Sequence, residues 1–197
     1  MKTYFRESVT KLAKTLPVPI LVLALGVMGS PPAEAEAQLG IAVEGRAGVT
    51  FPQGDLLDAG AESGFHTGGE VQVNLNSKLT AYLGVNRYAF NCDNGCGALG
   101  DNPRSTGLGA GLKYIIYNPG DVLAWGRGGI VANTFGSDSG SGDREIGFEL
   151  GVGADLPVAD RLYIVPNIGF VQHDSGRSAL DRASFFTLGL GVHYHVR

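Results

Sequence analysis

His173, Asp174 and Ser175 place a possible general base and a possible nucleophile two residues apart. A serine nucleophile needs a base within hydrogen-bond reach, and the base needs an acidic group to orient it. Asp174 or Asp181 could supply that group. The triplet is therefore a candidate hydrolytic site, although an ordinary polar loop is the interpretation that we favour.

Cys92 and Cys96 bracket three residues in a polar stretch. In an exported chain, such a pair is expected to form a local disulfide that stiffens the tip of a loop. A metal site there would need further ligands, for which His66 is only a remote candidate. We therefore expect a loop disulfide.

His193 and His195 alternate with apolar residues near the end of the chain, so they share one face of a predicted strand. Two histidines on one face could bind a metal together. Hydrogen bonds to carboxylates such as Glu44 are the interpretation that we favour. No resident cofactor or metal is expected.

The composition is that of an ordered chain of one-domain size. It has 197 residues, of which 44% are hydrophobic and 17% charged, and its formal net charge is -4. It has no basic block of the kind that binds nucleic acid, so nucleic acid is not an expected partner.

Residues 1–37 have the features of a signal peptide. Basic residues precede an apolar run over residues 16–28, which is too short to span a bilayer, and small residues follow up to Ala37. We expect cleavage after Ala37, leaving residues 38–197 as the mature domain, with cleavage after Ala35 as the alternative. No second apolar stretch is long enough for a transmembrane helix.

After residue 38 the dominant hydrophobic period is two, which is typical of strands with one apolar face. In one segment Leu83 and Val85 oppose Tyr82 and Asn86. In the fifth segment Trp125 falls on the polar side unless a bulge shifts the register. The eight segments lie within residues 41–51, 70–75, 79–88, 107–116, 123–135, 148–152, 162–170 and 188–196.

The connections between these segments alternate between short and long. The short ones cover residues 76–78, 118–120 and 156–160, and the long ones cover residues 52–64, 91–105, 136–144 and 173–183. An even number of strands with short turns on one side and long loops on the other is typical of outer-membrane barrels. The sequence therefore predicts an all-β, eight-stranded, antiparallel up-and-down transmembrane barrel.

The polar faces indicate a confined interior, because they are rich in glycine and the mature chain has only two lysines. Charges on the strands should neutralise one another there. The predicted polar network in the lumen comprises Glu44, Arg46, Glu70, Lys113, Arg127, Glu149, His193 and His195. The aromatic residues predicted to form girdles at the membrane interfaces are Phe51, Phe90, Tyr114, Phe135, Phe170, Phe185 and Tyr194.

With this pattern, and with the segments 147–155, 161–163 and 189–194, the chain resembles the small eight-stranded outer-membrane barrels of the OmpA, OmpX and opacity-protein type, within the porin-family outer-membrane proteins. The resemblance implies a monomer in the outer membrane of a Gram-negative-type cell, in contact with membrane lipid and lipopolysaccharide. Members commonly end in an aromatic residue that the barrel-assembly machinery reads. Here Tyr194 and Val196 would have to serve instead.

The leading hypothesis is a non-enzymatic barrel that presents surface loops for adhesion or envelope integrity. Outward-facing Arg87 would either snorkel or contact lipopolysaccharide phosphate. Three alternatives remain open: a narrow pore, a soluble periplasmic lipid-binding barrel, and a lipid A deacylase. The spacing of His173 and Ser175 resembles that of outer-membrane lipid A deacylases, but Gly176 stands where those enzymes usually have asparagine.

Overall fold

The computed structural model describes residues 40–92, 99–118, 120, 122–138, 140–178 and 180–196. The predicted signal peptide, residues 1–37, lies outside this part of the chain, so it stays a prediction. No helix among the described residues is long and apolar enough to cross a membrane.

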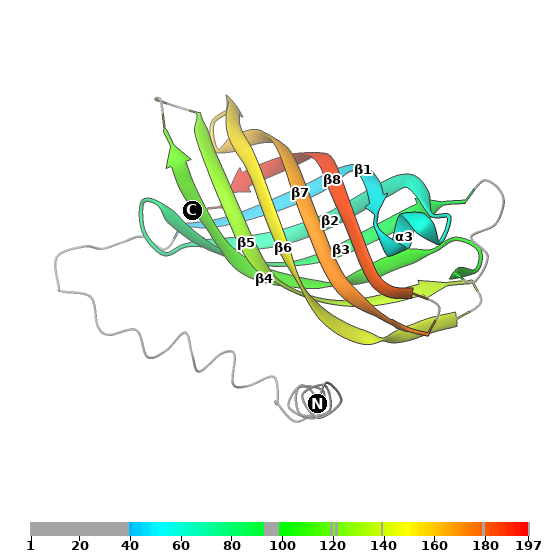
Figure 1. The fold of residues 1–197 in the computed structure, drawn as a ribbon. Helices are drawn as coiled ribbons and strands as arrows, with labels where there is room; N and C mark the ends of the chain where they lie inside the picture. The colour runs from blue at the N-terminus through cyan, green and yellow to red at the C-terminus, as the bar shows by residue number, and fades with distance from the viewer. Residues whose placement is uncertain are drawn as a thin grey trace, which may run out of the picture. The chain divides into compact units, whose positions relative to one another are not determined.

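In the described part of the chain, eight antiparallel strands close into a barrel in which each strand pairs with its neighbours in sequence and β1 pairs with β8 (Figure 1). The predicted eight-stranded up-and-down barrel is confirmed. A short helix, α3 (Asp55–Asp58), follows β1. The strands are β1 Ile41–Gln53, β2 Glu62–Asn74, β3 Leu79–Asn91, β4 Arg104–Tyr117, β5 Leu123–Ser137, β6 Gly140–Ala159, β7 Leu162–Arg177 and β8 Leu180–His195.

Large apolar side chains point outward from the barrel wall. On β3, Leu83 and Val85 are each 58% exposed, whereas Tyr82 and Asn86 on the alternate positions are buried. A continuous apolar outer surface of this kind fits the hydrocarbon core of a bilayer. The predicted transmembrane orientation is confirmed. A soluble lipid-binding barrel would instead have its apolar face inside.

The two ends of the barrel carry different connections. The short-turn end carries the turns at residues 75–78, 118–122 and 160–161, with the start of β1 and the end of β8. The opposite end, which we call the α3 end, carries α3, residues 99–103, the end of β5 with the start of β6, and the end of β7 with the start of β8. Figure 1 shows α3 at the end of the barrel remote from the C-terminus.

The prediction of long loops is wrong for two of the connections. Over residues 136–144, β5 and β6 continue and meet at a turn at 138–139. Over residues 173–183, β7 and β8 do the same around 178–179. These stretches are rich in glycine, serine and aspartate, which disfavour strands, but backbone pairing within each hairpin overrides that preference. His173 and Ser175 therefore lie in a strand.

The register of β5 places Trp125 inside the barrel, where it is 3% exposed. The pairing of β5 with β6 runs without a shift from Leu123 to Thr134, so no bulge displaces the tryptophan. The irregularity lies in β4, between Ile115 and Tyr117. Trp125 therefore lies on the polar side of the strand, as the sequence predicts when no bulge is present.

Candidate functional site in the barrel interior

A network of buried ion pairs crosses the lumen. Arg127 on β5 donates from Nη1 to Glu70 Oε2 and from Nη2 to Glu149 Oε1, each at 2.9 Å. Arg46 on β1 also donates to Glu70. Four strands, β1, β2, β5 and β6, are thereby joined through side chains inside the barrel. A buried charge is tolerated when it is paired, and both carboxylates are paired here.

Gln72 extends this network toward Glu44. Its Nε2 donates to Glu44 Oε2 at 2.9 Å and to Glu70 Oε1 at 2.7 Å. Glu44 is 4% exposed and lies on β1. A single amide therefore bridges two carboxylates that would otherwise repel each other without an intervening donor.

Tyr82 crosses the lumen to the same network because glycines leave it room. Its hydroxyl donates to Glu149 Oε1 at 2.7 Å, and the Arg127 guanidinium lies over its ring at 4.4 Å. A Cβ on Gly111 would lie 2.4 Å from the Tyr82 hydroxyl oxygen, and one on Gly129 would lie 2.3 Å from it. The glycines of the inner face thus leave the space into which the large side chain of Tyr82 packs.

A second polar cluster lies toward the short-turn end. Lys113 Nζ contacts Asp155 Oδ1 at 3.0 Å and Oδ2 at 2.9 Å. Trp125 Nε1 donates to Asp155 Oδ1 at 2.7 Å, and Lys113 lies 4.5 Å from the centre of the Trp125 ring. Asp155 is 4% exposed. It adds a fourth buried carboxylate to the three that the sequence places in the lumen.

His193 and His195 lie at this end of the lumen with their rings stacked, 4.6 Å between centroids. The predicted hydrogen bond from these histidines to Glu44 is wrong. Although His193 is opposite Glu44 in the register, the Glu44 carboxylate binds Gln72, and the carboxylate facing His193 is Asp155, 3.6 Å from Nδ1. Tyr163 packs against both histidine rings.

The structure does not join His173 to Ser175. His173 Nε2 instead forms a 2.8 Å hydrogen bond with Ser105 Oγ on β4, and its Nδ1 lies 2.7 Å from the carbonyl oxygen of Asp174. The Ser175 hydroxyl donates to the carbonyl of Leu180, and Arg177 N donates to Ser175 Oγ at 3.0 Å. Both side chains point inward from β7 in parallel, so each finds a partner elsewhere. The proposed Ser175 nucleophile therefore has no base beside it.

The remaining triad candidates do not complete a catalytic site either. Asp181 and Asp174 are exposed, whereas His173 and Ser105 are 1% and 0% exposed. Asn133 Nδ2 donates to Ser105 Oγ at 3.0 Å. The trio of Ser105, Asn133 and His173 is thus a buried, hydrogen-bonded connection between β4, β5 and β7.

An apolar cluster fills the lumen at the α3 end. Phe90, Phe135 and Phe185 pack together there, with Phe90 and Phe185 edge to face and their centroids 5.2 Å apart. The girdle prediction is wrong for these three residues, which occupy inward positions and are 0–3% exposed. Phe51, Tyr114 and Tyr194 do point outward. The full cluster is Leu56, Ala61, Tyr88, Phe90, Leu99, Val131, Phe135, Val171, Leu180, Ala183 and Phe185.

Between the ion pairs and this apolar cluster lies a cavity of about 30 Å³, lined by residues that include Arg46, His66 and Tyr88. Such a volume holds on the order of two water molecules. The described interior is therefore filled by side chains.

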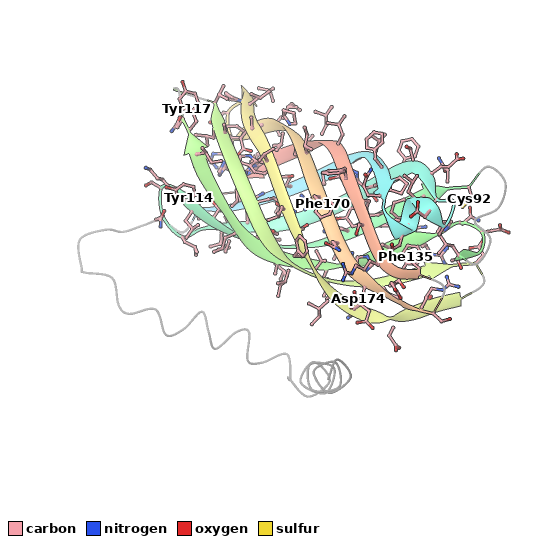
Figure 2. The ribbon with its side chains drawn as sticks, viewed as in Figure 1. Cys92, Tyr114, Tyr117, Phe135, Phe170 and Asp174 are labelled. Carbon is pink, nitrogen blue, oxygen red and sulfur yellow. The ribbon has the colours of Figure 1, made fainter. Side chains whose placement is uncertain are left out.

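At the α3 end, Asp138 joins two connections. Asn102 donates to its carboxylate at 2.6 Å and Arg104 pairs with it at 3.2 Å. These two partners, the amide first, lower the pKa of Asp138 below its ordinary value. Cys92 also lies at this end (Figure 2), but Cys96 is outside the described residues, so the disulfide stays a prediction.

The model of the outer membrane protein beta-barrel domain family matches residues 20–195. The chain belongs to this family. A search of curated proteins found no match. As an outer membrane beta-barrel protein, the chain is similar in fold to several solved structures, all at low sequence identity.

Neisserial surface protein A shares 15% identity with this barrel, with a TM-score of 0.64, and the match covers 78% of this chain and 96% of that one. The outer membrane protein OprG from Pseudomonas aeruginosa shares 12% identity, with a TM-score of 0.50 and coverage of 80% and 97%. A major outer membrane protein from Thermus thermophilus shares 16%, with a TM-score of 0.50 and coverage of 79% and 98%. These similarities concern the fold alone.

The sequence analysis missed five buried polar residues of this outer-membrane barrel. Gln72, Tyr82 and Asp155 belong to the ion-pair clusters. Ser105 and Asn133 belong to the hydrogen-bonded trio with His173. Strand parity places all five on inward faces. Asp155 follows Glu149 by six residues on β6, so it shares the face of Glu149. The alternation of inward and outward side chains along each strand could therefore have identified these residues.

Proposed function

We propose that this protein is a non-enzymatic outer-membrane anchor whose sealed barrel presents the connections at the α3 end to the outside of the cell. The observation that carries the proposal is the filled lumen. Arg127 with its two carboxylates blocks the middle, and Phe90, Phe135 and Phe185 block the α3 end. A barrel whose interior is packed in this way has only its wall and its ends for function.

The α3 end offers an exposed acidic surface for such a role. Exposed carboxylates there outnumber exposed arginines, so the rim favours cationic or polar partners over anionic ones. Adhesion and envelope integrity are the roles that fit a presented polar surface. The exposed carboxylates are Asp55, Asp58, Glu62, Asp101, Asp138, Asp143, Asp174 and Asp181.

On the outer wall, Arg87 is exposed and points toward lipid from β3, opposite Thr67 and Thr106. A guanidinium near the outer end of a strand can pair with a lipopolysaccharide phosphate. We propose this contact as the barrel's specific link to the outer leaflet. The barrel acts as a monomer in this account.

Site-specific proteolysis on intact cells tests the presentation of the α3 end. A protease recognition sequence inserted between residues 99 and 103 should be cut from outside, whereas the same sequence inserted in the turn at residues 75–78 should be cut only after the outer membrane is permeabilised. A change in gel mobility on boiling would show that each variant still folds into a barrel. Cleavage of the 75–78 variant alone would overturn the proposal.

A lipid A deacylase remains the second candidate from sequence, but no observation favours it. Ser175 and His173 are bonded to different partners. We therefore do not propose a hydrolytic role.

A further inference from the structure

The ring of His193 is the least satisfied polar group in the described part of the barrel. It is 3% exposed, yet neither of its nitrogens has a hydrogen-bond partner among the described residues. The nearest carboxylate oxygen, Asp155 Oδ2, lies 3.6 Å from Nδ1, which is too far for a hydrogen bond. Burying an imidazole in this way costs free energy unless something binds it.

A second imidazole lies beside it. His195 is two residues further along β8, on the same face, and its ring centroid lies 4.6 Å from that of His193. Because a metal ion lies about 2 Å from each ligating nitrogen, two imidazoles on one ion have centroids roughly 4.5 to 5 Å apart. The spacing therefore suits two ligands of one ion once the rings, which lie stacked with 28° between their planes, turn so that a nitrogen of each faces it.

Asp155 supplies the outer group that such a site needs. A ligating histidine usually donates its second ring N–H to a carboxylate, which fixes the tautomer and orients the ring. Asp155 faces His193 Nδ1 and is itself held by Lys113 and Trp125. With Nδ1 directed at Asp155, Nε2 of His193 is the nitrogen left for a metal.

The His195 side of the pair is open to solvent, because His195 is only partly buried and lies at the short-turn end of β8, whereas both nitrogens of His193 are buried. No group of three His, Cys, Asp or Glu side chains is arranged for a metal within the described ranges, so the two histidines would be the protein ligands and water would complete the shell. Lys113 remains paired with Asp155 and keeps that carboxylate from becoming a direct ligand.

We propose that His193 and His195 bind a late first-row divalent transition metal ion, with Asp155 as the positioning residue for His193. Imidazole ligands favour copper and zinc, and Cu²⁺ binds nitrogen ligands most tightly among the divalent ions of this row. The site is independent of the proposed anchoring function, since it lies at the opposite end of the barrel.

The experiment uses the untagged mature chain, folded in detergent, with Cu²⁺ alone as the probe. Equilibrium dialysis measures affinity, and electron paramagnetic resonance counts the nitrogen ligands. The wild type should bind one Cu²⁺ through two histidine nitrogens. His195→Asn and His193→Asn should each weaken binding at least tenfold and remove one nitrogen from the spectrum.

The other two histidines provide matched controls, because the chain has four in all. His66→Asn and His173→Asn should leave affinity and spectrum unchanged. Asp155→Asn should weaken binding roughly tenfold while two nitrogens remain in the spectrum, which a purely structural role would not produce.

Unchanged binding in His195→Asn would overturn the proposal, as would an equal loss in His66→Asn. If His193→Asn fails to form a heat-resistant barrel, His195→Asn decides the question, because His195 lies at the partly exposed end of the strand.

Discussion

Arg127 on β5 and Glu70 on β2 meet inside the barrel at 2.9 Å, although 57 residues separate them in sequence. The same guanidinium holds Glu149 on β6. This bridge joins strands from well-separated parts of the wall. It makes the middle of the lumen a closed layer of paired charges.

Replacing Arg127 with methionine should destabilise the barrel strongly. Glu70 and Glu149 would keep their burial but lose their shared cation, and breaking a buried ion pair costs about 3–5 kcal/mol. The free energy of unfolding in urea, followed by the heat-dependent change in gel mobility, measures this cost.

Arg104→Gln is the matched control for that substitution. Its partner Asp138 and Arg104 itself are 55% and 38% exposed, so solvent screens the pair and the loss should be far smaller than for Arg127. Equal effects of the two substitutions would contradict the ion-pair account of the lumen.

The Ser105–His173 hydrogen bond should stabilise the barrel and carry no chemistry. Ser105→Ala leaves His173 Nε2 and the Asn133 amide without their buried partner and should cost about 1–3 kcal/mol. Mass spectrometry of lipid A from cells with the wild type, Ser105→Ala or Ser175→Ala should show the same acyl chains in all three. Loss of an acyl chain in the wild type that is reversed in Ser175→Ala or in Ser105→Ala would instead identify an enzyme.

Gly111 should tolerate no side chain. A Cβ there would meet the Tyr82 hydroxyl at 2.4 Å and the Gly128 carbonyl oxygen at 2.3 Å. Gly111→Ala should therefore destabilise the barrel by about 1–3 kcal/mol through overpacking. Gly45→Ala, on the open outer face of β1, should change stability by roughly 0.5 kcal/mol or less. If Gly45→Ala proves the more damaging, the packing of Tyr82 is wrong.

Acid should break the link between Asp138 and its partners only at low pH. Asn102 and Arg104 lower the pKa of Asp138 in the folded state. Their contact with the Asp138 carboxylate therefore stabilises the folded state fully at a pH above the pKa that Asp138 has in the unfolded chain. It is lost as the pH falls through the folded pKa, below the ordinary value of 3.8. Carboxyl NMR titration should give a midpoint below that value, and Asn102→Ala should raise it. A midpoint at or above 3.8 would refute the contact.

Strand parity was sufficient to predict the wall and most of the interior. It places Glu70, Arg127 and Glu149 on inward faces, and it places Trp125 with them. Which inward residues touch was not predictable, because partners such as Tyr82 and Glu149 lie three strands apart and their pairing depends on barrel closure.

The continuation of β5 into β6 and of β7 into β8 as tight hairpins could not be predicted from the sequence either. The glycines and serines there have low strand propensity, and pairing between the two strands of each hairpin is what keeps them extended. The same reason explains the error at His173 and Ser175. A loop would have let the two side chains turn toward each other, whereas neighbouring inward positions of one strand keep them parallel.

The sealed lumen is the central claim, and ion conductance in planar lipid bilayers tests it most directly. The wild-type barrel, inserted at known density and confirmed as folded by its heat-dependent mobility, should give no discrete single-channel currents. Phe135→Ala combined with Phe185→Ala, which opens only the α3 end, should also stay silent because Arg127 still closes the middle. Reproducible stepwise currents from the wild type would contradict a filled lumen and would make the protein a pore.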